Sequence, residues 1–311
     1  MTDYPDLPLS AWRDTRDTLH LWTQIVGKIR LAKTPWLNHG WHVALYVTPK
    51  GLTTSAIPYE KRSFEMELDF IEHALHIRTS DGARRQIELA PRTVADFYAE
   101  VMAALNDLGL PVSITERPSE IPDAVDFSKD TTHASYDAEY ANRFWRVLVQ
   151  VDRVFKEFRT GFLGKSSPVH FFWGSFDLAV TRFSGRRAPV FKGKAPGLAP
   201  EVMQEAYSHE VSSAGFWPGG GGVDYPAFYS YAYPAPAAFS ELTVRPREAF
   251  FSKELGEFLL PYEAVRTAKD PDATLLAFLE STYDAAAVSG AWNRAELECS
   301  RGVAGSARKL E

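Results

Sequence analysis

Apolar residues recur at helical spacing in two long segments of this chain. Over residues 12–29 and 140–158 they follow one another three or four residues apart, which places them on one face of a helix. Two further helices are predicted over 94–108 and 271–289. Each is preceded by a good N-cap residue, a threonine in one case and an aspartate in the other, and each is followed by glycine.

The segments between these helices have strand patterns. Apolar and acidic residues alternate over 65–70, as in a strand with one buried face. Asp81–Gly82 favours a tight hairpin turn after the next strand. The apolar runs 41–47 and 169–183 are also predicted to be strands.

Both halves of the chain thus contain a helix, several strands and a helix, in that order. Residues 116–136 are acidic, proline-containing and without periodicity, which is typical of a connector. We therefore predict an α+β fold with halves at 1–115 and 137–300 and a flexible tail at 301–311. A structural duplication is one explanation of the similar order, and chance is the other.

Composition limits the class of protein. The 311 residues are 45% apolar and carry a net charge of −6, so a packed core is expected and binding to nucleic acid is not. The single cysteine and the absence of a signal peptide or a long apolar span predict a cytoplasmic protein that does not enter membranes. Aromatic residues make up 13% of the chain, enough to line a small-molecule pocket or a homodimer face.

Common catalytic signatures are missing. The glycines and lysine at 161–166 have the wrong spacing for a phosphate-binding loop, and they lie between a predicted helix and a strand. His209–Glu210 begins like a zinc protease motif, but Ser213 stands where the second histidine would be. Neither GxSxG nor GxGxxG occurs.

Histidines and carboxylates supply the remaining candidates for chemistry. If a helix continues from Pro200, Glu205 and His209 lie one turn apart and can bind a divalent transition metal or exchange a proton, with His170 as a further ligand. His209, Glu210 and His170 are accordingly candidate catalytic residues. An ordinary ion pair, or a histidine held in the core by hydrogen bonds, is the alternative explanation.

Other candidates come from polar residues in apolar surroundings. His20, beside the apolar face of the first helix, and His42 at the start of the first strand can line a cleft. Asp177 and Arg182 interrupt an apolar strand and, at odd spacing, point to opposite faces. Asp177 is a candidate catalytic residue and Arg182 a candidate anion ligand, although structural ion pairing is the favoured explanation of both.

Two glycine-rich loops have candidate binding residues beside them. The segment 178–200 contains five basic and no acidic residues, so Arg186 and its neighbours can grip an anion. The glycines at 219–222 lie between Trp217 and a group of tyrosines that includes Tyr229. This loop can form a lid over an aromatic pocket, or it can be a plain exposed turn.

The chain resembles an uncharacterised bacterial family of about this length, from Leu9 to Glu298. The resemblance is carried by these stretches: Thr18 to Leu31, Asn38 to Val43, Val169 to Arg186, Tyr207 to Pro218 and Phe228 to Pro234. It implies no activity, because none is known for the family.

Two functions are therefore expected. The first is an enzyme that acts on a small anionic molecule in a cleft lined by histidines and aromatic residues, with or without a metal. The second is a protein that binds a small molecule, or another protein, without catalysis.

Overall fold

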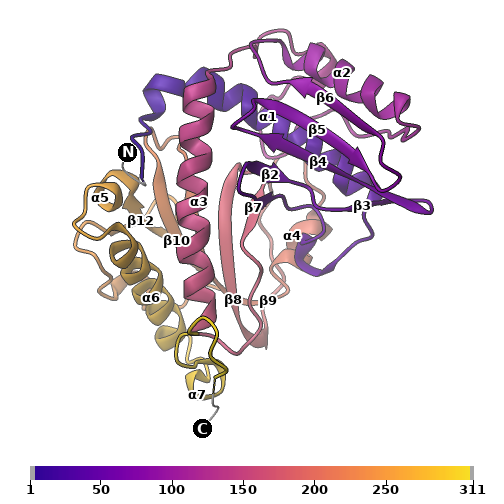
Figure 1. Cartoon of the computed structure of the whole chain (residues 1–311). Coiled ribbons are helices and arrows are strands. Elements are labelled where there is room, and N and C mark those ends of the chain that lie inside the picture. The colour runs from indigo at the N-terminus through magenta and orange to yellow at the C-terminus, as the bar shows by residue number, and fades with distance from the viewer. Residues whose placement is uncertain (1–3, 309–311) are drawn as a thin grey trace.

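The computed structural model describes residues 4–308. In this range it has seven α-helices and two antiparallel sheets, which confirms the α+β prediction. Figure 1 shows the first sheet with helix α2 at the upper right and the second sheet with α3, α5 and α6 below and to the left. The helices are α1 (Leu9–Lys33), α2 (Val94–Asp107), α3 (Ala138–Thr160), α4 (Pro200–Ala206), α5 (Tyr262–Arg266), α6 (Pro271–Ser289) and α7 (Arg294–Leu297).

The four predicted helices are confirmed as α1, α2, α3 and α6. The Thr93 side chain accepts a hydrogen bond from the amide of Asp96 at 3.0 Å, and Asp270 accepts one from the amide of Ala273 at 3.0 Å. These contacts satisfy amide groups that have no partner within the first turn of a helix, so the two caps fix where α2 and α6 begin.

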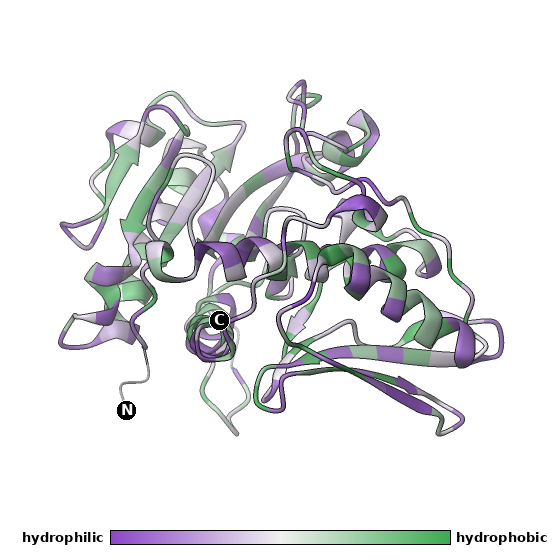
Figure 2. Ribbon diagram, turned by 90° about the horizontal axis from the view of Figure 1, so that it is seen from above, coloured by the Kyte–Doolittle hydropathy of each residue, from purple (hydrophilic) through white to green (hydrophobic). Residues whose placement is uncertain are grey.

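The first sheet has the strand order β1-β2-β4-β5-β6, with β3 paired to β4. Seen from above in Figure 2, hydrophilic and hydrophobic residues alternate along its long strands. The strand predicted over 65–70 is confirmed as the end of β4, but Glu67 and Asp69 on its polar face are buried as well. Gly82 has a φ of 90° in the predicted hairpin turn. The strands are β1 (Tyr46–Val47), β2 (Gly51–Thr53), β3 (Ile57–Tyr59), β4 (Arg62–Asp69), β5 (Ala74–Thr79) and β6 (Arg84–Glu88).

The second sheet has the order β11-β12-β10-β9-β8-β7. This order differs from that of the first sheet, so a duplication of one half is not confirmed. The strands are β7 (His170–Phe172), β8 (Asp177–Arg187), β9 (His209–Trp217), β10 (Ala227–Tyr233), β11 (Phe250–Ser252) and β12 (Glu257–Pro261).

Two predicted strands are wrong in extent. Within 41–47 only Tyr46–Val47 forms a strand, and Trp41 follows a 3-10 turn instead. The run 169–183 is divided, because the chain turns between β7 and β8 with Phe176 at a φ of 61°. In both places part of the apolar run lies in a loop of irregular backbone. An apolar run alone does not distinguish such a loop from a strand.

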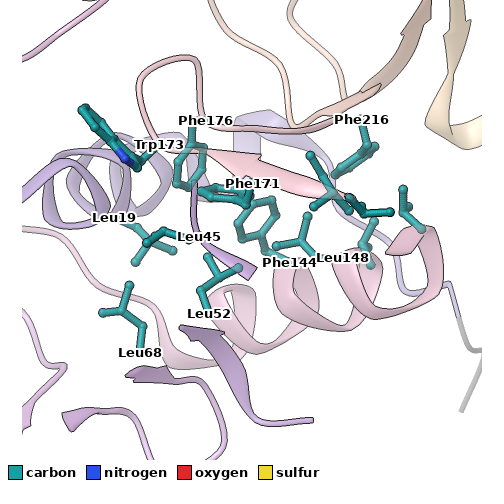
Figure 3. Packing of buried hydrophobic residues seen from close by; sticks show 14 of the residues in the cluster. Leu19, Leu45, Leu52, Leu68, Phe144, Leu148, Phe171, Trp173, Phe176 and Phe216 are labelled. Atoms are coloured by element: carbon teal, nitrogen blue, oxygen red, sulfur yellow. The ribbon is translucent and has the colours of Figure 1, made fainter. Parts of the chain in front are cut away.

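One apolar core joins the two sheets. Figure 3 shows its side chains in a continuous row from Leu68 of the first sheet, past Leu45 and Phe171, to Phe216 of the second. Leu45 and Phe171 also exchange backbone hydrogen bonds of 2.9 Å in each direction. The sheets are therefore held together by both packing and hydrogen bonding.

The predicted connector, 116–136, has a single 3-10 turn at Phe127–Lys129 and otherwise irregular backbone. It is fixed to α1 by Gln24, whose amide group donates to Ser119 O at 2.9 Å and accepts from Ser119 N at 2.8 Å. Of the predicted flexible tail, Arg301 pairs with Glu157 at 2.7 Å, while 309–311 lie outside the described residues. None of the helices described is long and apolar enough to cross a membrane.

Candidate functional site

A cavity of about 840 Å³ lies over one face of the second sheet. This volume is within the usual range for sites that hold small organic molecules. Its walls come from α1, the loop around 36–43, the connector at 120–125, the β7–β8 turn, α4, and strands β8, β9, β10 and β12. The connector that the sequence marked as a boundary is thus one wall of the cavity.

Strand β8 supplies alternate residues to this cavity. Asp177, Ala179 and Thr181 line it, whereas Arg182 is absent from its walls. The prediction that Asp177 and Arg182 face opposite sides of one strand is confirmed. The other face of the sheet, with Arg182, packs against helices α3 and α6.

Asp177 is the buried polar group at the base of the cavity. The residue is only 5% exposed, and its Oδ1 atom has no hydrogen bond of ordinary geometry among the described residues. The Ser175 hydroxyl, which donates to Glu120, lies near enough to act on the pKa of Asp177 by lowering it. The Oδ2 atom of Asp177 accepts a hydrogen bond from the phenol of Tyr229. Burial, and next the nearby Glu120 carboxylate, raise the pKa of Asp177 to about 7. Asp177 can therefore gain or lose a proton near neutral pH.

Tyr229 reaches Asp177 because of a glycine between them. Residue pairs Ala179–Gly215 and Gly215–Tyr229 lie in one row across β8, β9 and β10. A Cβ atom added at Gly215 would lie 2.3 Å from the Tyr229 hydroxyl oxygen, closer than any van der Waals contact. The Tyr229 side chain thus crosses the sheet over Gly215, which is the close approach that glycine within a strand often marks.

Further hydroxyl groups lie beside this pair. The Tyr231 ring stacks on the Tyr229 ring at a centroid distance of 6.1 Å, and its hydroxyl lies 3.0 Å from that of Tyr207. Thr181 and Ser213 share a hydrogen bond of 2.8 Å in the same part of the wall. Burial raises the pKa values of Tyr207, Tyr229 and Tyr231, so these phenols keep their protons and can donate hydrogen bonds.

Glu120 and Glu257 add two more carboxylates to the cavity. Glu120 accepts a hydrogen bond of 3.1 Å from Ser175, and Glu257 has no hydrogen bond or ion pair within the part of the chain described. Burial raises the pKa of Glu120. Burial, and next the nearby Asp177, raise the pKa of Glu257 to about 7. This part of the cavity is therefore acidic.

Three histidines that line the cavity are hydrogen-bonded to the protein. His20 Nε2 lies 2.8 Å from Gly174 O and 3.1 Å from the Gln24 amide, while His42 Nδ1 accepts from the amide of Leu37 at 3.2 Å. His39 lies between two backbone carbonyls and Lys165, whose ammonium is 2.6 Å from Nε2. Burial lowers the pKa of all three, that of His20 to about 4. They are neutral at pH 7 and position the walls.

His170 is enclosed by aromatic rings and does not line the cavity. The rings of Trp41, Tyr46 and Phe172 surround it at centroid distances of 5.4–5.6 Å. Neither ring nitrogen has a partner among the described residues. Burial, and next the charges of Arg30 and Arg159, lower the pKa of His170 to about 3. A proton-transfer or ligand role for His170 in the cavity has no contact to support it.

The predicted pairing of Glu205 with His209 is not formed. Helix α4 ends at Ala206, and His209 begins strand β9, so the helical spacing that would bring the two together is interrupted. Glu205 accepts a hydrogen bond from Trp36, and His209 Nδ1 lies 3.0 Å from the Ser208 hydroxyl. Glu205, His209 and His170 form no group of metal ligands within residues 4–308.

The two arginines expected to bind an anion are occupied elsewhere. Arg182 is buried below the rings of Phe158 and Tyr283 and donates to Phe158 O. Arg186 pairs with Glu210 at 2.6 Å and donates to the backbone after α6. Glu210, proposed above as a catalytic residue, is therefore one half of an exposed ion pair.

Trp217 does line the cavity, as predicted, together with Gly221 of the glycine run. All four glycines from 219 to 222 have positive φ angles, a conformation that other residues adopt at a cost in energy. Gly220 exchanges backbone hydrogen bonds of 2.8 and 2.9 Å with Val223. The run forms an ordered turn between β9 and β10 at the edge of the cavity.

A second group of potential metal ligands lies in the first sheet. One atom each of Asp69, Glu72 and His76 lies within 4.8 Å of the others. The ammonium of Lys50, however, is 3.2 Å from both Asp69 Oδ2 and Glu72 Oε1. A cationic side chain thus already balances these carboxylates, and the group forms an ion-pair network.

The sequence analysis missed Glu120, Glu257, Tyr207 and Tyr231. The sequence does contain a signal for the tyrosines. Tyr229 and Tyr231 are two residues apart in a strand, so they share one face, and Gly215 leaves space for a large side chain in the strand beside it. For the glutamates there was none. Glu120 lies in the connector and Glu257 in the β11–β12 hairpin. No local sequence pattern predicts that either segment reaches the cavity.

Comparison with known proteins gives one result. Neither the curated proteins nor the solved structures include a match to this chain. The model of a family of unknown function, DUF5996, matches residues 4–299. The resemblance inferred from the sequence is thereby confirmed, and the chain belongs to this family.

Proposed function

We propose that the protein is an enzyme that acts on a small organic molecule in the cavity, with Asp177 as the group that exchanges a proton with it. The observation that carries this proposal is the unsatisfied Oδ1 atom of Asp177. A buried oxygen without a partner is costly for a fold. Because Asp177 lines the cavity, a ligand there can supply the missing hydrogen bond.

The surroundings of Asp177 suit general acid–base catalysis. A proton-transfer group works best when its pKa is close to the working pH, and that of Asp177 is about 7. Tyr229 fixes the carboxyl group from one side through Oδ2, and leaves Oδ1 for a ligand. The cavity walls are largely aromatic and apolar, and burial among them keeps the pKa of the carboxyl group raised.

A metal is not needed for this proposal. The histidines expected to bind one are separated in the structure, and Asp177, Glu120 and Glu257 do not form a group of ligand atoms within 4.8 Å in the described residues. The prediction of an anionic substrate rested on Arg182 and Arg186, and neither residue lines the cavity.

Binding without catalysis is the second candidate. It is favoured by the histidines, because His20, His39 and His42 are all hydrogen-bonded to protein groups and neutral. In this case Asp177 serves only as a hydrogen-bond acceptor for a ligand.

Asp177→Asn separates these candidates. The purified protein is incubated with a mixture of metabolites, and mass spectrometry follows which compound is consumed and which product forms. We expect turnover in the unchanged protein and a loss of at least about 100-fold in the variant, since the amide accepts no proton. Asp284→Asn, at an exposed carboxylate paired with Arg294, is the matched control and should retain full activity. Undiminished turnover in Asp177→Asn contradicts the catalytic role, and binding without turnover in the unchanged protein supports the second candidate.

A further inference from the structure

Five carboxylates line the cavity, and three of them have no cation to balance them. Glu120, Asp177 and Glu257 all line it, and none of them forms an ion pair in the described part of the chain. The other charged wall residues are already paired, Arg16 with Asp17 at 2.9 Å and His133 with Asp130 at 2.7 Å. The negative charge at the base of the cavity therefore has no counterpart in the protein.

The three carboxylates also lie close enough to repel one another. Glu120 acts to raise the pKa of Asp177, and Asp177 that of Glu257, in each case after burial itself. Such mutual repulsion is relieved when a cation enters, because an opposite charge favours the ionised form of each carboxyl group. An anion at the same place would be repelled.

Aromatic rings form the walls around these carboxylates. Tyr229 and Tyr231 of β10, Tyr207 after α4 and Trp217 of β9 all line the cavity. Aromatic faces attract cations, and their area binds the carbon skeleton of a ligand. Acidic groups within an aromatic enclosure are complementary to an organic cation.

The shape of the site distinguishes an organic cation from a metal ion. A metal bound by these three residues needs one oxygen of each at bonding distance from a common centre. The oxygen atoms of the three residues do not all lie within 4.8 Å of one another in the described structure, whereas a cavity of about 840 Å³ has room for a molecule of many atoms.

We infer that the molecule held in the cavity is a protonated organic amine whose N–H groups donate to Asp177 Oδ1 and whose carbon skeleton contacts the aromatic walls. A quaternary ammonium lacks the N–H donor that this oxygen requires, so a primary or secondary amine, or a guanidinium, is the class of ligand. This inference rests on the proposed function, because it identifies the substrate class of the same cavity.

Four compounds with one carbon skeleton test it. They are 2-phenylethylamine, its N,N,N-trimethyl derivative, 2-phenylethanol and phenylacetate. Binding of each to the unchanged protein is measured by titration calorimetry at millimolar concentration and neutral pH. We expect the primary amine to bind most tightly, the trimethyl derivative and the alcohol more weakly, and the carboxylate not at all.

Variants of the cavity carboxylates then locate the charge. Asp177→Asn should weaken binding of the amine at least about 30-fold, since it removes one partner of a buried ion pair. It should leave the affinity for 2-phenylethanol unchanged. Glu257→Gln should have a smaller effect of the same sign. Glu254→Gln makes the same change at an exposed position of the same hairpin and should have none. Circular dichroism verifies that each variant is folded.

The outcomes separate this inference from the proposed function. If the amine does not bind, binds no more tightly than the alcohol or carboxylate, or binds equally well to Asp177→Asn, the amine class is rejected. If the trimethyl derivative matches the primary amine, the required N–H donor is rejected. Neither result changes the turnover test above, which counts against the proposed enzyme if a substrate is consumed without Asp177 or if a ligand binds without turnover.

Discussion

The two faces of β8 each bury a charged side chain, in opposite ways. On the helix face, Arg182 lies against the rings of Phe158 and Tyr283 and donates to a backbone carbonyl. On the cavity face, Asp177 has one oxygen bonded to Tyr229 and the other bonded to nothing. The two residues are only five positions apart in one strand.

This difference shows which buried charge is structural. Arg182 is surrounded by the groups that stabilise a guanidinium, including aromatic faces, and it fills space between the sheet and two helices. Asp177 has no cation beside it and adjoins open space. Each side chain keeps one buried atom without a hydrogen-bond partner among the described residues, Nε of Arg182 and Oδ1 of Asp177. Only the atom of Asp177 belongs to a residue that lines the cavity, where a ligand can reach it.

Removal of the Arg182 side chain should have the largest effect on stability. Arg182→Ala leaves a hole between Phe158, Phe162 and Tyr283, so the free energy of unfolding should fall by roughly 3–5 kcal/mol. Urea denaturation followed by circular dichroism measures this change.

Arg182→Met is the control for this variant. It fills the same space without charge, and it should lose less than half as much, because an apolar side chain of similar volume replaces a buried charge well. If both variants are equally unstable, the charge itself is essential and packing is not the main role of Arg182.

Asp177→Asn should raise the free energy of unfolding at neutral pH, by less than Arg182→Ala lowers it. The pKa of Asp177 is about 7 in the folded protein, above its ordinary value of 3.8, so the wild-type protein loses stability as the pH rises from 4 to 7. The amide has no charge to bury. The pKa difference amounts to about 4 kcal/mol above pH 7, and an unpaired N–H of the buried amide takes back about 1–2 kcal/mol. The variant should therefore be more stable than wild type above pH 7, by roughly 2–3 kcal/mol, and slightly less stable below pH 4.

Denaturation at a series of pH values measures this difference. Asp284→Asn, which changes an exposed carboxylate, should show no such gain. If Asp177→Asn is less stable than wild type at pH 8, the carboxylate is a structural group like Arg182, and the contrast between the two faces of β8 fails.

Much of this contrast follows from the sequence, but the cavity does not. Period-two alternation correctly placed Asp177 and Arg182 on opposite faces, because neighbouring side chains of a strand must point to opposite sides. The alternation does not show which face is covered by helices. That depends on the strand order and on where α3 and α6 pack, which are decided by contacts between distant residues.

The acidic group illustrates the same limit. Glu257 lines the same cavity as Asp177 because β12 joins the sheet of β8 by pairing with β10. Glu120 comes there because Gln24 binds the connector through Ser119. Neither pairing leaves a local pattern, whereas the helices and their caps depend on residues three or four positions apart and were predicted correctly.

His170 offers the last and smallest test, because it shares a face with Asp177 without sharing its cavity. It pairs with Ala179 across β7 and β8, but aromatic rings enclose it. The pKa of His170 is lowered to about 3, below its ordinary value of 6.5, so its burial stabilises the fold above pH 6.5 and this stability is lost as the pH falls. At pH 5 the loss is about 2 kcal/mol. His170→Phe, with a ring that cannot be protonated, should remove that loss while binding of 2-phenylethylamine remains unchanged. Denaturation at pH 5 and pH 8 measures the first effect and calorimetry the second. Weaker amine binding in this variant would show that His170 contributes to the cavity after all, and that the boundary between the aromatic enclosure and the acidic site is not where the structure places it.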